Sequence, residues 1–251
     1  MIQRQQLLSY LNQELNVAAI KDYCPNGLQV EGSDTIQHIV TGVTASQRLI
    51  DAAIELGADT LLVHHGYFWK GEEPTVTGMK RRRLGSLIQH NINLIAYHLP
   101  IDVHPVWGNN AQLGALMGCS DISAVNGIAP EGVVMQGSVD TTFTDLVTTI
   151  ERVLGRPCVA TESAQQDAVT RVAWCTGGGQ SFIEQAATAG AEVFITGEVS
   201  EQTIHIAREM NIGFIAAGHH ATERYGVKAV GEHLANEFGL SVDFIDIDNP
   251  A

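Results

Sequence analysis

The feature that most constrains this chain is an internal repeat. The segment from Ile39 to Gly66 corresponds to the segment from Val172 to Glu201 when a gap of two residues is allowed. Each contains an apolar run that ends in Thr-Gly, a pair of adjacent alanines, a Gly-Ala-acid turn and a second apolar run. Further on, residues 91–102 match residues 211–223 more weakly. A duplication of this length predicts two similar structural units.

Each repeat reads as strand, helix, strand, helix, strand, which is typical of parallel strands joined by right-handed crossovers. The sequence therefore predicts an α/β fold with two similar, duplicated α/β halves and mainly parallel sheets. We expect residues 1–125 to form the N-terminal half and residues 126–251 the C-terminal half, whose last helix and strand could pack back on the first half. Nearly unbroken apolar runs predict strands covered on both faces, at Leu61–Val63, Ile92–Ala96, Phe194–Thr196 and Phe214–Ala217.

Outside the repeats the pattern predicts further elements. A short strand is expected at Gly132–Val139, a helix at Thr144–Leu154 that ends at Gly155, and a loop at Thr161–Asp167. Apolar stripes predict helices around Leu7–Leu15 and Val227–Phe238, with a last strand at Val242–Ile247 and a turn at Pro25.

Charge and composition exclude several classes of protein. The chain carries 28 Asp and Glu against 14 Lys and Arg, a formal net charge of −14, so it would repel a phosphate backbone and is no general nucleic-acid binder. It has no apolar stretch long enough to span a membrane and no apolar core of a secretory signal, so we expect a cytoplasmic protein. The four cysteines form no CxxC pair, which favours buried free thiols.

Polar residues gather where the predicted strands end. Ligands in open parallel sheets bind beyond the carboxyl ends of the strands. Five His and three carboxylates fall at this edge: His64, His65, His98, Asp102, Glu198, His219, His220 and Glu223. Neighbouring strand residues point to opposite faces, so the His64-His65 pair suits two adjacent ions better than one. His219 and Glu223 are four residues apart at the start of a helix, so their side chains converge.

Three imidazoles and two carboxylates exceed the needs of a four-coordinate catalytic zinc and suit a two-metal site. Nitrogen and oxygen donors without thiolate fit zinc, manganese, iron or cobalt. A hydrogen-bonded polar cluster without metal remains the alternative on residue spacing alone.

Six segments together resemble the YbgI-type family, also called NIF-three-like or type 2 GTP cyclohydrolase I homologues, in its bacterial form. They are VTGVTAS, GADTLLVHHGYFW, YHLPIDVHPVWGNN, TGGGQSFI, ITGEVSEQTIHIARE and AAGHHATERYG, and the match covers essentially the whole chain. The resemblance implies two divalent metal ions per chain held between two α/β halves, and toroidal homohexamers built as a trimer of dimers. The family's metal ligands fall on His64, His65, Asp102, His219 and Glu223.

Three residues are candidates for a catalytic role. Glu198 would accept a hydrogen bond from a ligand or act as a general base, or it is a solvated loop acid. His98 would orient a ligand or move protons, or it is a core imidazole bonded to backbone. His205 would contact substrate. Gly177–Gly179 are read either as an anion site or as a packing requirement.

Two further segments each allow two interpretations. Lys80–Arg83 place four of the 14 basic residues in consecutive positions, either as a solvated helix face or as a docking surface for a phosphate-bearing substrate or an acidic subunit. Tyr67–Trp69, directly after the His pair, would stack a heterocycle or pack at a subunit contact.

Two functions follow from this sequence. The first is a metal-dependent hydrolase acting on a small substrate, with a nucleotide-like or heterocyclic substrate and cyclohydrolase activity implied only by the resemblance. The second is a non-catalytic metal-binding protein, either an oligomeric scaffold or a metal carrier.

Overall fold

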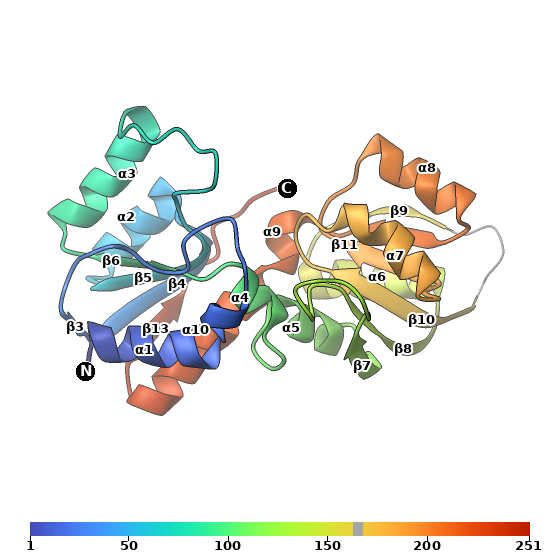
Figure 1. The fold of residues 1–251 in the computed structure, drawn as a ribbon, viewed down its shortest axis with the longest axis horizontal. Coiled ribbons are helices and arrows are strands. Elements are labelled where there is room, and N and C mark those ends of the chain that lie inside the picture. Colours follow the sequence, from blue (N-terminus) through green and yellow to red (C-terminus); the bar gives the residue numbers. More distant parts are fainter. Residues whose placement is uncertain (163–167) are drawn as a thin grey trace. The chain divides into compact units, whose positions relative to one another are not determined.

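The computed structural model describes residues 1–162 and 168–251, and the chain divides into two compact units. Unit 1 comprises Met1–Ile101 and Gly226–Asp248, and unit 2 comprises Asp102–Tyr225 and Asn249–Ala251. In Figure 1 both the blue start of the chain and the red helix α10 (Arg224–Phe238) therefore belong largely to unit 1. Most of the loop predicted at residues 161–167 lies outside the described residues.

The main sheet of unit 1 has the strand order β13-β4-β5-β6-β2. The bounds are Ser241–Phe244 (β13), His38–Thr44 (β4), Thr60–His65 (β5), Asn93–Ala96 (β6) and Gly27–Val30 (β2). Strands β13, β4, β5 and β6 are parallel, and β2 is antiparallel at one edge. Two short strands, β1 (Ile2–Gln3) and β3 (Thr35–Ile36), pair with each other. The parallel order brings the carboxyl ends of β4, β5 and β6 to one edge.

Helices cover both faces of this sheet. They are α1 (Arg4–Glu14), α2 (Gln47–Glu55), α3 (Gly78–Gln89) and α10, with a 3-10 turn η1 (Val17–Ala19). Leu49 of α2 and Leu87 of α3 share one buried cluster with Leu61 and Val63. On the other face, a Cβ at Gly231 of α10 would lie 2.8 Å from Thr41 Cγ2, so a glycine lets the helix approach β4 closely. Figure 1 shows α2 and α3 on one side of the strands and α1 and α10 on the other.

The described residues of unit 2 form a mixed sheet of order β7-β8-β10-β11-β12-β9. The bounds are Ser120–Ala124 (β7), Met135–Thr142 (β8), Ala168–Cys175 (β10), Val193–Thr196 (β11), Gly213–Ala216 (β12) and Val159–Thr161 (β9). Strands β10, β11 and β12 are parallel, whereas β7, β8 and β9 run antiparallel to their neighbours. The parallel centre is thus flanked by antiparallel strands on both sides.

The helices of unit 2 are α5, α6, α7, α8 and α9, with a 3-10 turn η2. Their bounds are Asn109–Leu116 (α5), Phe143–Leu154 (α6), Ile183–Thr188 (α7), Glu201–Glu209 (α8), His219–Thr222 (α9) and Gln180–Phe182 (η2). Alternate residues of the central strands enter two separate cores, as strand geometry requires. Trp174 and Ile195 pack in the cluster with α5 and α6, and Phe194 and Phe214 pack in the cluster with α7 and α8.

The predicted α/β class is confirmed, and the four apolar runs form β5, β6, β11 and β12. The helix predicted at 144–154 is α6, and Gly155 follows it with a φ of 69°. The strand predicted at Gly132–Val139 is shifted to Met135–Thr142. The sheet of unit 2 is mixed because β8 and β9 join it from segments outside the repeat.

The units also divide the sequence differently from the repeat boundary expected at residue 125. Residues 102–125 group with unit 2, where β7 pairs with β8. The segment Gly226–Asp248 groups with unit 1, where β13 pairs with β4, which is the packing on the first half that was allowed for the last helix and strand. Among the described residues, helices long and apolar enough to cross a membrane are absent.

Candidate metal centre

The His64-His65 pair lies at the carboxyl end of β5, where the apolar run of this central strand gives way to polar residues. The two imidazole centroids are 4.4 Å apart, with His64 buried and His65 partly buried. His64 Nδ1 lies 3.2 Å from the carbonyl oxygen of Tyr97. Because a carbonyl only accepts, Nδ1 carries the proton and Nε2 has the lone pair, which is the form that binds metals. His65 Nδ1 lies 3.1 Å from Thr44 Oγ1 on the neighbouring strand.

A third imidazole, His98, follows strand β6 and reaches the same edge of unit 1. Its centroid is 5.0 Å from that of His64 and 5.7 Å from that of His65. One ring nitrogen from each of the three residues lies within 4.8 Å of the others. Unit 1 therefore brings together three nitrogen donors that could hold a metal ion. His98 is itself buried, and its ring nitrogen bonds to a carboxylate rather than to the backbone.

His98 is held by a carboxylate that the sequence reasoning missed. Asp22 Oδ1 accepts from His98 Nδ1 at 3.0 Å, and Asp22 Oδ2 accepts from Asn26 Nδ2 at 3.0 Å. Burial raises the pKa of Asp22, but the hydrogen bonds from His98 and Asn26 outweigh it and hold the pKa well below its usual range. The signal in the sequence was the acid and amide four residues apart in DYCPNG, just before edge strand β2.

Aromatic rings close one side of this imidazole group. Trp69 meets His98 edge-on at 4.9 Å between centroids and lies 5.9 Å from His65. Tyr23 also meets His98 edge-on, at 5.0 Å. Of the three aromatic residues after the His pair, Trp69 thus lies at the site, whereas the hydroxyl of buried Tyr67 donates to the carbonyl oxygen of Ala45.

In unit 2, His219 and Glu223 converge as their spacing predicts. His219 Nε2 lies 3.2 Å from Glu223 Oε2, and His219 Nδ1 lies 2.7 Å from Glu198 Oε1. Burial lowers the pKa of His219, but Glu223 and Glu198 outweigh it and raise the pKa to about 9. Gln180 Nε2 donates to Glu198 Oε2 at 3.1 Å. Glu198 therefore lies where it can orient His219, which is one of its two expected roles.

The second carboxylate of unit 2, Asp102, lies in a short helix α4 (Leu99–Val103). Pro100 occupies the first turn of this helix, where its missing N–H has no partner to lose. Asp102 is only 6% exposed, and its Oδ1 accepts from Asn109 Nδ2 at 2.9 Å. An oxygen of Asp102 and one of Glu223 lie within 4.8 Å of each other.

The glycine run after β10 and the cysteine that ends this strand both have structural roles in unit 2. Gly177 N donates to Thr222 Oγ1 at 2.9 Å and Gly179 N donates to Thr196 Oγ1 at 3.0 Å, which favours a packing role for the glycines over an anion site. Burial raises the pKa of the Cys175 thiol, and Asp102 and Glu223 raise it further. The thiol therefore stays protonated, as expected for a buried structural cysteine.

The remaining candidates lie elsewhere. His205 is exposed on α8, where its Nε2 lies 3.9 Å from Glu201 Oε1, and its catalytic role stays a prediction. The basic residues at the start of α3 differ in their contacts. Lys80 pairs with Glu72 at 3.2 Å and lies over the Phe68 ring, so it anchors the segment after the His pair. Arg81 and Arg82 are exposed.

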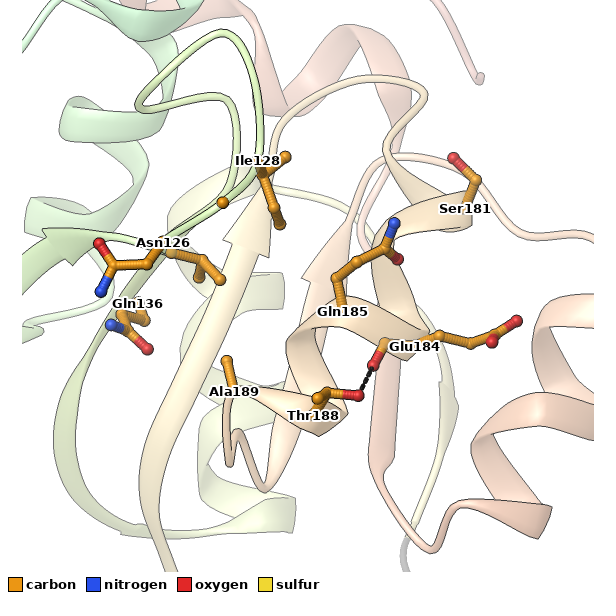
Figure 2. A pocket seen from close by; sticks show the side chains of 10 residues that line it. Asn126, Ile128, Gln136, Ser181, Glu184, Gln185, Thr188 and Ala189 are labelled. Carbon is orange, nitrogen blue, oxygen red and sulfur yellow. Dashed lines mark hydrogen bonds between the residues drawn. The ribbon is translucent and has the colours of Figure 1, made fainter.

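A separate pocket of about 680 Å³ opens in unit 2 between the segment after β7 and helix α7 (Figure 2). Neutral polar side chains, including Asn126, Gln136 and Gln185, share its lining with Glu184. The predicted metal ligands do not line it.

The whole chain is similar to several known proteins. The family described as Duf34/NIF3 (NGG1p interacting factor 3) matches residues 2–250. Relatives in Yersinia pestis and Escherichia coli (strain K12), both named GTP cyclohydrolase 1 type 2 homolog, are 54% identical over 246 residues, covering 98% of each chain. A solved structure described as protein ybgI, of unknown function, has a TM-score of 0.96 and 54% identity with 100% of both chains covered. The structure of TTHA1606 from Thermus thermophilus has a TM-score of 0.92 and 32% identity over 100% of both chains.

Proposed function

We propose that this chain, which belongs to the Duf34/NIF3 family, binds two divalent metal ions through His64, His65, Asp102, His219 and Glu223. The observation that carries the proposal is the chemistry of the donors. Unit 1 offers imidazole nitrogens at one strand edge, and unit 2 offers two buried carboxylates within 4.8 Å of each other beside an imidazole. Buried like charges this close repel, and a divalent cation offsets that repulsion. Nitrogen and oxygen donors fit zinc, iron, manganese or cobalt.

On this basis we propose a metal-dependent hydrolase. When bound, two such ions activate a water molecule and polarise the bond that it attacks. Glu198 would orient His219, and His98 would handle a proton at the imidazole group. The relatives' name, GTP cyclohydrolase 1 type 2 homolog, is the support for a small nucleotide-like or heterocyclic substrate.

Metal content tests the ligand assignment. Asp102→Ala and Glu223→Ala should each lower the metal bound per chain by elemental analysis after reconstitution and gel filtration, because each removes a buried oxygen donor. Glu55→Ala, which removes an exposed carboxylate on α2, is the matched control and should bind as the wild type does. Two metals retained per chain in either ligand variant would reject the assignment.

A non-catalytic metal carrier or scaffold is the second candidate. It is favoured by the burial of the donors, since His64 is 0% and Glu223 is 3% exposed, which suits holding an ion. A panel of nucleotides, pterin precursors, phosphoesters and peptides separates the two functions with metal-reconstituted protein. Turnover that His64→Ala abolishes supports the hydrolase, and inactivity with tight metal uptake supports the carrier.

We also propose a homohexamer, a trimer of dimers, on the family resemblance. Sedimentation equilibrium should give six times the chain mass. A stable monomer across the concentration range would remove this proposal.

A further inference from the structure

The side chains of Asp22 and His98 are buried and are held by several hydrogen bonds besides the one between them. The two side chains are 3% and 7% exposed and meet at 3.0 Å. Asp22 Oδ1 also accepts from Tyr23 N at 2.7 Å, and Asp22 Oδ2 accepts from Leu99 N at 3.0 Å. Asn26 Oδ1 accepts from His98 N at 2.8 Å. Both the ring and the backbone of His98 are therefore fixed.

These bonds determine which nitrogen of His98 carries the proton. An ionised carboxylate only accepts, so the nitrogen that faces Asp22 must be protonated. In the neutral imidazole the lone pair then lies on Nε2. The ring sits beside His64 and His65, with Trp69 and Tyr23 edge-on to it.

We propose that Asp22 is a positioning residue that holds His98 as the Nδ1–H tautomer, so that Nε2 accepts a proton beside His64 and His65. This inference rests on the proposed hydrolase function. In the step, an O–H bond of the attacking water breaks, its proton forms an N–H bond at His98 Nε2, and the electron pair stays on the oxygen. The Asp22 carboxylate stabilises the imidazolium that results.

Substitution of Asp22 by Asn should reverse the tautomer. Both oxygens of Asp22 face backbone N–H groups, so the amide nitrogen of Asn must oppose one of them. Placed at the Oδ2 position it would lose the bonds from Leu99 and Asn26. Placed at the Oδ1 position it loses one backbone bond, from Tyr23, and the weak 3.8 Å bond from Cys24 Sγ, and it can donate to His98 Nδ1. The second arrangement is favoured, and it puts the ring proton on Nε2.

Nitrogen NMR of the full-length metal-free protein tests this directly. Long-range ¹H–¹⁵N correlation distinguishes the tautomers at about pH 8, above the ordinary imidazole pKa of about 6.5. His98→Gln assigns the signals by removing them. We expect the Nδ1–H pattern in the wild type and the Nε2–H pattern in Asp22→Asn. The wild-type measurement decides by itself, because an Nε2–H pattern there would overturn the proposal even if Asp22→Asn failed to fold.

Asn26→Ala is the matched control. It removes bonds to Asp22 Oδ2 and to the His98 backbone but leaves the bond between the ring and Asp22 Oδ1. A purely structural disturbance should lower stability in this variant and keep the Nδ1–H tautomer. If Asn26→Ala changed the tautomer as Asp22→Asn does, Asp22 would not be the determinant.

Zinc addition separates a proton acceptor from a ligand. In zinc-loaded protein the signals of His64 and His65 should show coordination, and those of His98 should not. Coordination at His98 would overturn the proton-acceptor role.

For a substrate that the panel identifies, Asp22→Asn should lower kcat roughly 10²- to 10⁴-fold with metal content unchanged. An unchanged kcat would reject the proton-acceptor role of His98. Inactivity across the whole panel would remove the hydrolase function and this role together. The tautomer measurement tests the effect of Asp22 on His98 without metal and without turnover.

Discussion

At the scale of single residues, the position of Glu223 depends on a glycine across from it. Gly177 has a φ of 64°, and a Cβ there would overlap Glu223 Oε1 and approach His219 Nε2 to 3.2 Å. Both the left-handed backbone and the missing side chain are needed at this position. The Gly-Gly-Gly run of the sequence therefore serves the candidate metal ligands through close packing.

Gly177→Ala should cost stability and metal. Gly57→Ala is its control, since Gly57 has a similar φ of 68° and nothing within 4 Å of the position of a Cβ. The control should cost about 1–2 kcal/mol of unfolding free energy from backbone strain alone. Gly177→Ala should cost more, and it should lower bound metal in elemental analysis because Glu223 is displaced. Equal losses of stability and equal metal content in the two variants would contradict this account.

Asp22 also predicts how stability depends on acid pH. Its pKa in the folded protein lies below the ordinary value of about 3.9, so its contribution is fully present above about pH 4 and is lost as pH falls further. Urea unfolding between about pH 5 and pH 2 should show a steeper loss for the wild type than for Asp22→Asn. Parallel curves would mean that the carboxylate contributes no pH-dependent stability.

The site residues that could be predicted are those with a short sequence separation. His219 and Glu223 are four residues apart, and His64 and His65 are adjacent, so their spacing carries local geometric information. Asp22 and His98 meet across 76 positions of sequence, and only the pairing of β2 with β6 makes them neighbours. Local sequence patterns therefore do not predict the contact between Asp22 and His98.

At the scale of elements, the buried parallel strands were predictable, and so was the edge strand β13, whereas the edge strands β7 and β9 of unit 2 were not. Strands β5, β6 and β11 are apolar runs because helices cover both of their faces. β7 is mostly exposed and polar, and β9 has three residues, so neither leaves an apolar signal. Their places in the sheet are set by pairing with β8 and β12 rather than by their own composition.

Helix α2, which follows β4, depends on its N-cap. Ser46 Oγ accepts from Leu49 N at 3.3 Å, whereas Thr77 at the start of α3 makes no side-chain cap bond. Ser46→Ala should lower the free energy of unfolding by about 1 kcal/mol, and Thr77→Ala by less. Chemical denaturation of both variants provides the measurement. Equal effects would show that the Ser46 bond does not determine the stability of α2.

At the scale of the whole molecule, each of the two units contributes some of the candidate metal ligands. His64 and His65 belong to unit 1, and Asp102, His219 and Glu223 belong to unit 2. The duplication explains why each unit ends parallel strands in polar residues. It does not explain α10 and β13, which follow the second repeat in sequence yet join the sheet and helices of unit 1.

The net charge of −14 predicts a dependence of stability on salt. Several ion pairs join a cation to a largely exposed acid, such as Arg4 with Glu31 and Asp34, and exposed pairs contribute only about 0–1 kcal/mol each. General repulsion among 28 carboxylates should therefore outweigh the attraction that salt screens. With a chelator present, raising NaCl from about 0.01 M to about 1 M, which shortens the Debye length from about 30 Å to about 3 Å, should raise the Tm.

A charge variant separates this repulsion from other effects of salt. Glu55→Lys at an exposed position of α2 changes the net charge from −14 to −12, because a negative charge is replaced by a positive one. The variant should have a higher Tm than the wild type in low salt, and the difference should shrink as NaCl screens the field. If NaCl instead lowered the Tm of the wild type, local ion pairs would contribute more to stability than the excess of carboxylates takes away.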